Sequence, residues 1–304
     1  MSGTVYLVGA GPGAPDLITL RAARLLGEAN IVFHDALVPQ EILLIASKAE
    51  KIAVGKRCGR HSSAQMFINK RLADAAAKHR VVVRLKGGDP SIFGRAHEEI
   101  SFLVSNQIRV EVVPGVTAAL AASADLAVSL TRRGIARSVA FVTPRVGHGE
   151  RESTWIASVL VADTAAIYMG TGEAAAIAAA LIAAGKPGRT PIAVVENASL
   201  SNMKVLRGIL RELPELAART EGGPTLILLG EVYGATATAG CFQAAYGVLR
   251  NAIQIAKRNR ATNQPSDHSA IDRPRKVQST TAHSPVPENS VCSVRDSGKF
   301  SSMK

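Results

Sequence analysis

The chain has 304 residues, of which 47% are hydrophobic and 20% charged, and this balance excludes a wholly disordered protein. Its length allows one large domain or two modest ones. The formal net charge is +12, and half of this excess lies in residues 235–304. A second concentration lies in residues 51–100, where eleven basic residues stand against four acidic ones. Such a local excess of positive charge favours a polyanionic partner, either nucleic acid or a small molecule with many carboxylates or phosphates. A basic face that is merely solvated has the same composition.

Short β-branched segments alternate with helical patterns from residue 4 to about residue 230. Between the first two segments, apolar residues from Ile18 to Ala29 follow helical spacing, with Asp16 as a candidate N-cap. The alternation predicts an α/β fold with largely parallel strands buried on both faces. The predicted strands are Thr4–Val8, Ile31–Phe33, Lys51–Val54, Val81–Leu85, Val110–Val113, Ser138–Val142, Ala165–Tyr168, Ile192–Val195 and Thr225–Leu229.

The turn at residues 112–117 lies near the midpoint of this pattern and predicts a junction between two α/β domains, residues 1–115 and 116–234. Residues 241–257 are compatible with one helix. Beyond them the sequence loses its periodicity, and its Ser, Thr, Pro and Asn cannot bury enough surface to offset the entropy of ordering. We therefore expect residues 235–304 to form a basic, largely disordered tail.

No apolar segment is long enough to cross a membrane, and the chain begins with a strand-like segment in place of a signal-peptide pattern. These features predict a cytoplasmic protein. The three cysteines lie far apart and the histidines are scattered, so the sequence offers neither a disulfide framework nor a cluster of metal ligands. We expect no metal site.

Two glycine-rich segments follow predicted strands. The first, Gly9–Gly13, does not match a dinucleotide-binding loop, because Pro12 and Pro15 interrupt the start of the helix and no glycine stands three residues after Gly11. Taken alone, it fits a ligand loop and a tight βα turn equally well. The second, Gly87-Gly88-Asp89, lies where ligands bind in open α/β folds. Asp89 could bind a ligand or cap the next turn, but the two segments together favour a site.

Asp35 follows the second predicted strand, and Lys56 follows the third. Because the carboxyl ends of parallel strands meet at one edge of a sheet, both side chains should lie on the same side as the glycine segments. Each residue taken singly is more often a cap or a surface charge. Their shared edge favours a cleft.

Seven segments of the chain resemble those of the tetrapyrrole methylases in sequence, order and spacing. They are VGAGPGAPDLITLRA, DALV, VGKRCGRHSSAQ, RLKGGDPSIFGR, VVPGVTAALAA, YMG and PIAVVENAS. The stretch at residues 55–65 most resembles that of the uroporphyrinogen-III C-methyltransferases. The resemblance covers residues 4–234.

The resemblance implies two α/β domains, distinct from the Rossmann-type methyltransferase fold, with S-adenosylmethionine bound in a cleft between them and usually a homodimer. It implies transfer of two methyl groups to C-2 and C-7 of uroporphyrinogen III, giving precorrin-2 for siroheme or cobalamin synthesis. The chain shows no dehydrogenase–ferrochelatase module of the kind found in multifunctional siroheme synthases, so other proteins are expected to carry out the later steps.

Individual roles follow from the same resemblance. Asp35 matches the family's proposed proton acceptor and Lys56 its proposed donor. Since the substrate is a polycarboxylate, arginines suit its cleft through paired hydrogen bonds. The expected substrate wall is Arg57, Arg60, His61, Arg84 and Arg95. The expected cofactor contacts are Pro12, Gly87, Gly88, Asp89, Ile92, Thr117, Ala118, Met169 and Ala198, the last standing where relatives usually have glycine.

Two alternatives stay open. One is a methylase on the same scaffold that acts on a later precorrin or on another substrate, against which the stretch at 55–65 argues. The other is a nucleic-acid-binding protein that uses the basic surface. Its low aromatic content, 4%, argues against a platform for stacked bases.

Overall fold

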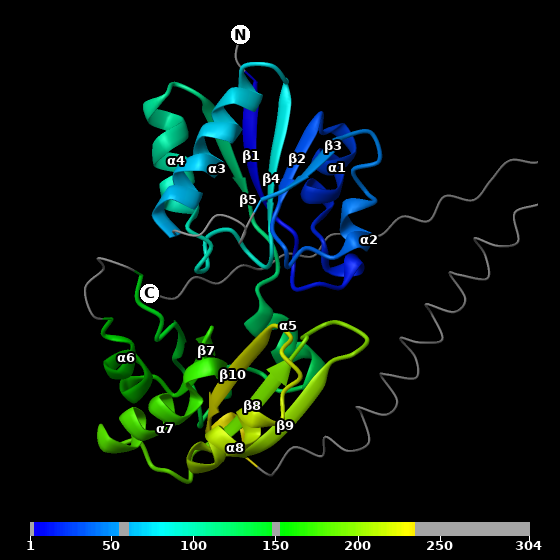
Figure 1. Cartoon of the computed structure of the whole chain (residues 1–304). Helices are drawn as coiled ribbons and strands as arrows, with labels where there is room; N and C mark the ends of the chain where they lie inside the picture. The colour runs from blue at the N-terminus through cyan, green and yellow to red at the C-terminus, as the bar shows by residue number, and fades with distance from the viewer. Residues whose placement is uncertain (1–2, 55–60, 148–152, 235–304) are drawn as a thin grey trace, which may run out of the picture. The chain divides into compact units, whose positions relative to one another are not determined.

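The structure, a computed structural model, describes residues 3–54, 61–147 and 153–234, and of residues 61–64 it describes only the backbone. These ranges form two five-stranded sheets with helices on both faces of each (Figure 1). The predicted α/β class is confirmed, and all nine predicted strands are present with ends that agree to within one residue.

The first sheet is entirely parallel and has the strand order β3-β2-β4-β1-β5. Its central strand β4 is buried along its whole length, and the sequence there is apolar except for two buried charged residues, Arg84 and Lys86. Parallel order brings the carboxyl ends of all five strands to one edge. The strands are β1 (Thr4–Gly9), β2 (Ile31–His34), β3 (Glu50–Ala53), β4 (Val81–Lys86) and β5 (Arg109–Val113).

Helices cover both faces of the first sheet (Figure 1). One face packs against α1 (Leu20–Glu28) and α2 (Gln40–Leu43), and the other against α3 (His61–Ala76) and α4 (Ala96–Ser105). The predicted cap at Asp16 is wrong. Asp16 lies in the short 3-10 helix η1 (Pro15–Leu17), and the Thr19 hydroxyl accepts the capping hydrogen bond from the Ala22 N–H.

The second sheet is mixed, with the order β6-β7-β10-β8-β9. Only β6 and β7 are parallel, so the expectation of largely parallel strands is wrong for this half. Strand β9 was not predicted either, because Lys, Arg and Gly interrupt its apolar pattern. The strands are β6 (Val139–Val142), β7 (Thr164–Tyr168), β8 (Pro191–Glu196), β9 (Lys204–Ile209) and β10 (Thr225–Gly230).

One face of the second sheet packs against α6 (Trp155–Val161), α7 (Ala174–Ala183) and α8 (Leu213–Ala218). The other face packs against α5 (Ala118–Asp125), whose Ala119 and Ala122 are fully buried. Alanine is the small side chain that lets a helix approach a sheet closely. Three short 3-10 helices complete this half: η2 (Thr171–Glu173), η3 (Leu210–Glu212) and η4 (Glu231–Tyr233).

Residues 114–117 connect β5, the edge strand of the first sheet, to α5, which packs on the second. The limits proposed for the domains, 1–115 and 116–234, remain a prediction. Within the described residues no helix is long and apolar enough to span a membrane. The tail at 235–304 lies outside the described residues.

Candidate active site

The ends of β1, β4 and β5 meet backbone to backbone. Gly11 and Gly88 exchange two hydrogen bonds, 3.1 Å and 2.7 Å long. A Cβ on Gly115 would lie 2.3 Å from the Gly88 carbonyl oxygen, and a Cβ on Gly9 would lie 2.6 Å from the Gly115 nitrogen. These glycines are therefore required by close approach, and together they form a wall made largely of backbone.

Asp89 links two of the loops that form this wall. Its Oδ1 accepts a hydrogen bond of 2.7 Å from the Ser91 N–H, and its Oδ2 accepts one of 2.9 Å from the Gly115 N–H. The capping role considered from the sequence is thus present, and the same carboxylate also joins the β4 loop to the β5 loop. A contact between Asp89 and a cofactor remains a prediction.

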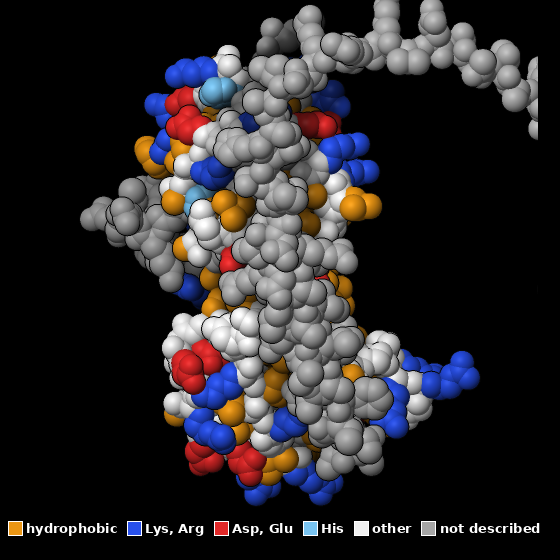
Figure 2. All heavy atoms as spheres, turned by 90° about the vertical axis from the view of Figure 1, so that its right-hand side faces the viewer, with side chains coloured by type: hydrophobic (Ala, Val, Ile, Leu, Met, Phe, Trp, Pro, Cys, Tyr) orange, Lys and Arg blue, Asp and Glu red, His pale blue; other side chains and the backbone are white. Residues whose placement is uncertain are grey.

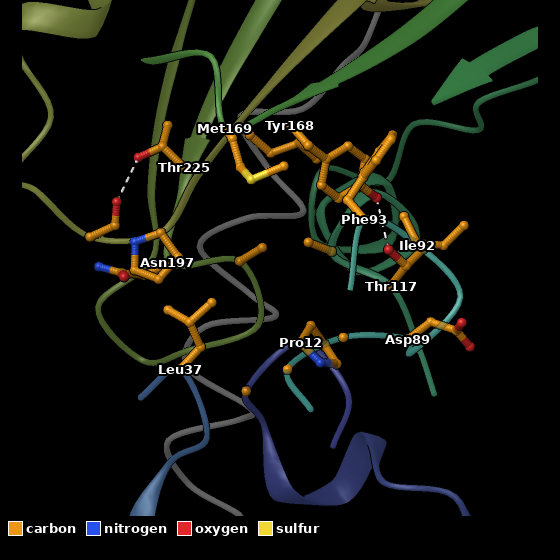
Figure 3. A pocket seen from close by; sticks show the side chains of 18 of the residues that line it. Pro12, Leu37, Asp89, Ile92, Phe93, Thr117, Tyr168, Met169, Asn197 and Thr225 are labelled. Atoms are coloured by element: carbon orange, nitrogen blue, oxygen red, sulfur yellow. Dashed lines mark hydrogen bonds between the residues drawn. The ribbon is translucent and has the colours of Figure 1, made fainter. Parts of the chain in front are cut away.

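The wall lines a cavity of about 520 Å³, within the usual range for small-molecule sites. Figure 3 shows Pro12 and Leu37 facing this cavity from one side and Met169 and Thr225 from the other. Asp35 also lines it, after the end of β2. So do all nine residues expected to contact the cofactor: Pro12, Gly87, Gly88, Asp89, Ile92, Thr117, Ala118, Met169 and Ala198. The structure brings them together, and their individual contacts remain predictions.

Tyr168, at the end of β7 in the second sheet, contacts cavity residues that follow strands of the first sheet. Its hydroxyl forms a hydrogen bond of 2.8 Å with the Thr117 hydroxyl (Figure 3) and accepts one of 3.2 Å from the Ala119 N–H. Its ring lies 5.1 Å from the ring of Phe93, which follows β4. Burial raises the pKa of Tyr168 above its usual value, and its two hydrogen bonds oppose part of the shift. It therefore stays a neutral phenol at physiological pH.

A second connection runs through Ser199, which follows β8. Its hydroxyl accepts a hydrogen bond of 3.0 Å from the Ala14 N–H, and its own N–H donates one of 2.7 Å to Asp125. Ser199 has a φ of 70°, and the cavity residues Met169 and Asn197 have φ values of 56° and 54°. Non-glycine residues in this left-handed region are uncommon and concentrate at ligand sites.

Asp35 is the partly exposed end of a network of four charged groups, whose other three members are buried. Arg84 Nη2 donates to Asp35 Oδ1 at 2.5 Å, and Arg84 Nε donates to Glu99 Oε1 at 3.1 Å. Lys86 Nζ donates to Glu99 Oε2 at 2.9 Å, and the side-chain amide of Gln65 donates to Glu99 Oε1 at 3.2 Å. Two cations thus balance two anions, and Asp35 and Lys86 also line the cavity.

Burial and charge act on the two cations differently. Burial lowers the pKa of Lys86, and the nearby charge of Arg84 lowers it further, while Glu99 opposes the shift. Burial alone would also lower the pKa of Arg84, but the carboxylates of Asp35 and Glu99 outweigh it and raise that pKa overall. Arg84 is therefore a permanent cation, whereas Glu99 only opposes the lowering of the Lys86 pKa.

The expected substrate wall is only partly described. Lys56, Arg57 and Arg60 lie outside the described residues, and of His61 only the backbone is described, at the start of α3.

Neither Arg84 nor Arg95 is among the residues that line the cavity. Arg84 is 3% exposed and its guanidinium already binds two carboxylates. It therefore lies behind the residues that line the cavity and is not one of them. Arg95 lies just before α4 and forms two hydrogen bonds with Glu98, at 2.6 Å and 2.7 Å.

Four residues of this region were not predicted from the sequence: Lys86, Glu99, Arg145 and Tyr168. Glu99 had a signal, because it shares the buried face of α4 with Ala96 and Leu103, where an apolar side chain is expected. Arg145 is exposed and lines the cavity. A Gly-x-Gly pattern, Gly147 and Gly149, follows it in the sequence and is the signal that could have marked this loop.

On the face in Figure 2, the visible described residues carry Lys and Arg interspersed with Asp and Glu. Within the described ranges, no group of three His, Cys, Asp or Glu side chains is placed to hold a metal ion. The absence of a metal requirement remains a prediction.

A cavity at the carboxyl ends of β1, β2 and β4, lined also by loops of the second sheet, defines an α/β protein with a cavity of ligand size between its two sheets. The family model of the tetrapyrrole (corrin/porphyrin) methylases matches residues 4–214. The chain belongs to this family.

Several individual proteins are similar to the chain. A siroheme synthase of Pseudomonas entomophila is 46% identical over 232 residues, which are 76% of this chain and 50% of that protein. The chain thus spans about half the length of this curated relative. A uroporphyrin-III C-methyltransferase from Thermus thermophilus, complexed with S-adenosylhomocysteine, is 40% identical with a TM-score of 0.67, covering 76% of this chain and 93% of its own. A cobalt precorrin-4 methyltransferase is 26% identical with a TM-score of 0.68, covering 76% and 96%.

Proposed function

We propose that the chain is an S-adenosylmethionine-dependent methyltransferase that methylates C-2 and C-7 of uroporphyrinogen III to give precorrin-2. The observation that carries this proposal is the single cavity wall that unites Asp35 with all nine expected cofactor residues. The similar Thermus thermophilus enzyme, crystallised with S-adenosylhomocysteine, supports the same ligand class.

The cavity fits such a ligand in size and in chemistry. Its volume of about 520 Å³ suits a nucleoside-sized molecule. A Cβ on Gly87 would lie 3.2 Å from the Leu37 Cβ, so the glycine keeps space open beside the wall. Apolar side chains such as Ile92 and Met169 provide surface for a ring, and the Asn197 amide provides a polar partner.

The residues of the chain then have distinct tasks. When bound, S-adenosylmethionine supplies an electrophilic methyl group on a sulfonium centre. The glycine wall and Tyr168 fix the ligand's position, and holding methyl and pyrrole carbon in line accounts for much of the rate. The Asp35 carboxylate accepts the proton that leaves the macrocycle after carbon methylation, and Lys56 is the proposed donor. Arg145, together with Arg57, Arg60 and His61, is proposed to bind substrate carboxylates.

A labelling experiment tests the function directly. The purified chain is incubated anaerobically with uroporphyrinogen III and S-adenosylmethionine carrying a labelled methyl group. We expect two labels in each macrocycle. Absence of transfer, with correctly folded protein, would overturn the proposal. Transfer only to a later, already methylated precorrin would favour a different methylase of this family.

We also propose that the chain acts in the cytoplasm as a homodimer. The resemblance of residues 4–234 to the tetrapyrrole methylases, which are usually homodimers, supports self-association. Light scattering on a size-exclusion column measures the mass of the assembly. A monomeric mass at micromolar concentration would contradict the dimer.

A further inference from the structure

We propose that Arg84 is a positioning residue for the Asp35 carboxylate, and that buried Glu99 is the counter-ion that holds Arg84 in place. The inference deepens the proposed function and rests on it, since it takes Asp35 to be the group that accepts the substrate proton. Arg84 itself is not expected to touch the substrate.

The geometry of Arg84 leaves its guanidinium little freedom. Nε donates to Glu99 Oε1 at 3.1 Å, and Nη1 donates to the Leu85 carbonyl oxygen at 3.2 Å. The third nitrogen, Nη2, donates to Asp35 Oδ1 at 2.5 Å. Because the guanidinium is planar and two of its nitrogens are fixed within the protein, the direction of the third is fixed as well.

The burial of the three groups follows a gradient towards the cavity. The Glu99 side chain is 0% exposed, that of Arg84 is 4% exposed, and that of Asp35 is 31% exposed. Only Asp35 among the three lines the cavity. The fixed interior of the sheet is therefore coupled, through Arg84, to a single carboxylate that a ligand can reach.

The backbone of Asp35 is held by the same strand. Its N–H donates to the Leu85 carbonyl at 3.3 Å, so Leu85 in β4 contacts both the Asp35 backbone and the Arg84 guanidinium. A carboxylate has roughly four lone-pair sites on two oxygens, so the bond at Oδ1 leaves capacity for an incoming proton. Asp35 is thereby oriented without being saturated.

Glu99 makes this arrangement possible in a dry interior. A buried guanidinium without a partner charge is strongly unfavourable, and Glu99 supplies that charge while accepting from Lys86 and Gln65 as well. Buried ion pairs are often no more stabilising than apolar residues of the same volume. A network of four charges beside a cavity is therefore better explained by the position that it gives Asp35 than by its contribution to folding.

The test is a double-mutant cycle on the full chain, with the methyl-transfer rate measured in a single turnover. The variants are Arg84→Lys, Asp35→Asn and the double variant. Lysine keeps the charge but cannot reproduce the three directed bonds. We expect Arg84→Lys to lower the rate about 100-fold, the cost of a misplacement near 1 Å, with S-adenosylmethionine affinity within about twofold. In the Asp35→Asn background the same change should have almost no further effect, because no base remains to be positioned.

Arg109→Lys is the matched control. Arg109 lies on β5, the edge strand of the same sheet, and forms an ion pair of 2.6 Å with Glu111, but both side chains are exposed and neither lines the cavity. This variant should keep the full rate.

The outcomes separate the positioning role from the proposed function. Independent, additive losses from Arg84→Lys and Asp35→Asn would overturn the positioning role. So would a normal rate in Arg84→Lys when Asp35→Asn is slow. A normal rate in Asp35→Asn alone would instead remove Asp35 from the mechanism, and the positioning proposal with it.

A second variant tests the proposal if Arg84→Lys does not fold. Glu99→Gln keeps the shape of the side chain and removes its charge, and its rate loss should likewise vanish in the Asp35→Asn background. Unfolding of both Arg84→Lys and Glu99→Gln, measured by thermal denaturation, would overturn the proposal, because a structural role would then suffice to explain the pair.

Discussion

Asp35 lies where the cavity meets the buried charges of the first sheet. Its carboxylate is partly exposed, and Arg84 and the backbone of β4 hold it from behind. A group in this position is both accessible to a ligand and fixed in direction. These are the two conditions that a general base requires.

Replacing Asp35 by Asn should therefore affect turnover more than binding. Asparagine has nearly the same shape but cannot accept a proton at neutral pH. We expect methyl transfer to fall by about 10²–10⁴-fold, the usual contribution of a general base. Isothermal titration with S-adenosylhomocysteine should show an affinity close to that of the unchanged chain. An equal loss of affinity would indicate that Asp35 holds the ligand.

Tyr233, in η4, is a buried residue whose hydroxyl has no hydrogen-bond partner among the described residues. Burial raises the pKa of Tyr233 far above its usual range, and the charge of Arg207 opposes a small part of this. Because the folded state holds the proton more tightly than the unfolded state, the unfolded state loses it first as the pH rises above about 10. The free energy of unfolding should therefore decrease above that pH.

Tyr233→Phe should remove this alkaline loss. At pH 7 we expect the free energy of unfolding to be unchanged or raised by about 1 kcal/mol, since an unpaired buried hydroxyl is lost. Urea titrations between pH 7 and 11 measure both effects. If the free energies of unfolding of Tyr233→Phe and of the unchanged chain fall equally between pH 7 and 11, Tyr233 is not the cause of the alkaline loss.

At the residue scale, the sequence predicted which groups surround the cavity better than it predicted what each group does. Asp35 and the glycines could be placed because strand ends share one edge of a parallel sheet. Arg84 was expected to bind substrate because guanidinium groups suit carboxylates. The structure offers it the carboxylates of Asp35 and Glu99 instead, and only the packing of α4 against β4 brings Glu99 there.

At the scale of elements, the cavity depends on how closely the ends of β1, β4 and β5 approach one another. Gly115 is the tightest point, because an added Cβ would lie 2.3 Å from the Gly88 carbonyl and 2.9 Å from the Gly9 Cα. Neither contact is with a side chain that could turn away. Relief of the clash must move the backbone of the wall itself.

Gly115→Ala should therefore weaken ligand binding. Overpacking typically costs about 1–3 kcal/mol, and if this appears in the cavity the affinity for S-adenosylhomocysteine falls by roughly 5- to 150-fold. Titration calorimetry measures the affinity. Gly27→Ala, in α1, is the control, because its Cβ would meet nothing within 4 Å. Full affinity in Gly115→Ala would show that the wall yields without cost.

The strands themselves were predicted well, and their directions less well. Buried apolar runs identify strands whichever way they point, so nine of them agreed with the sequence pattern. β8 and β9 are joined by residues 197–203, a connection too short for the crossover that a parallel pair requires. Missing β9 therefore also concealed the antiparallel character of the second sheet.

At the scale of the whole molecule, the cavity is assembled from a long stretch of the chain. Its lining residues extend from Gly11 to Leu226. No residue after Leu226 among those described contributes to it.

A chain ending at Lys257 should therefore retain methyl transfer at a rate close to that of the full chain. The labelled-methyl assay compares the two, with circular dichroism as the check on folding. A large loss of activity in a folded, truncated chain would show that residues 258–304 contribute to the site or to assembly.

The register of the first sheet has a consequence for how the chain folds. Within this sheet β1 is synthesised before the two strands that pair with it. Thr4 of β1 lies opposite Val81 of β4 and Arg109 of β5. β1 must therefore stay unpaired until β4 and β5 have been synthesised, a situation that slows folding and exposes the strand to aggregation. In the second sheet, β7 must likewise wait for β10, but β8 and β9 follow one another directly and can form a hairpin at once. The half that carries the glycine wall is thus expected to acquire its structure more slowly than the half that closes over it.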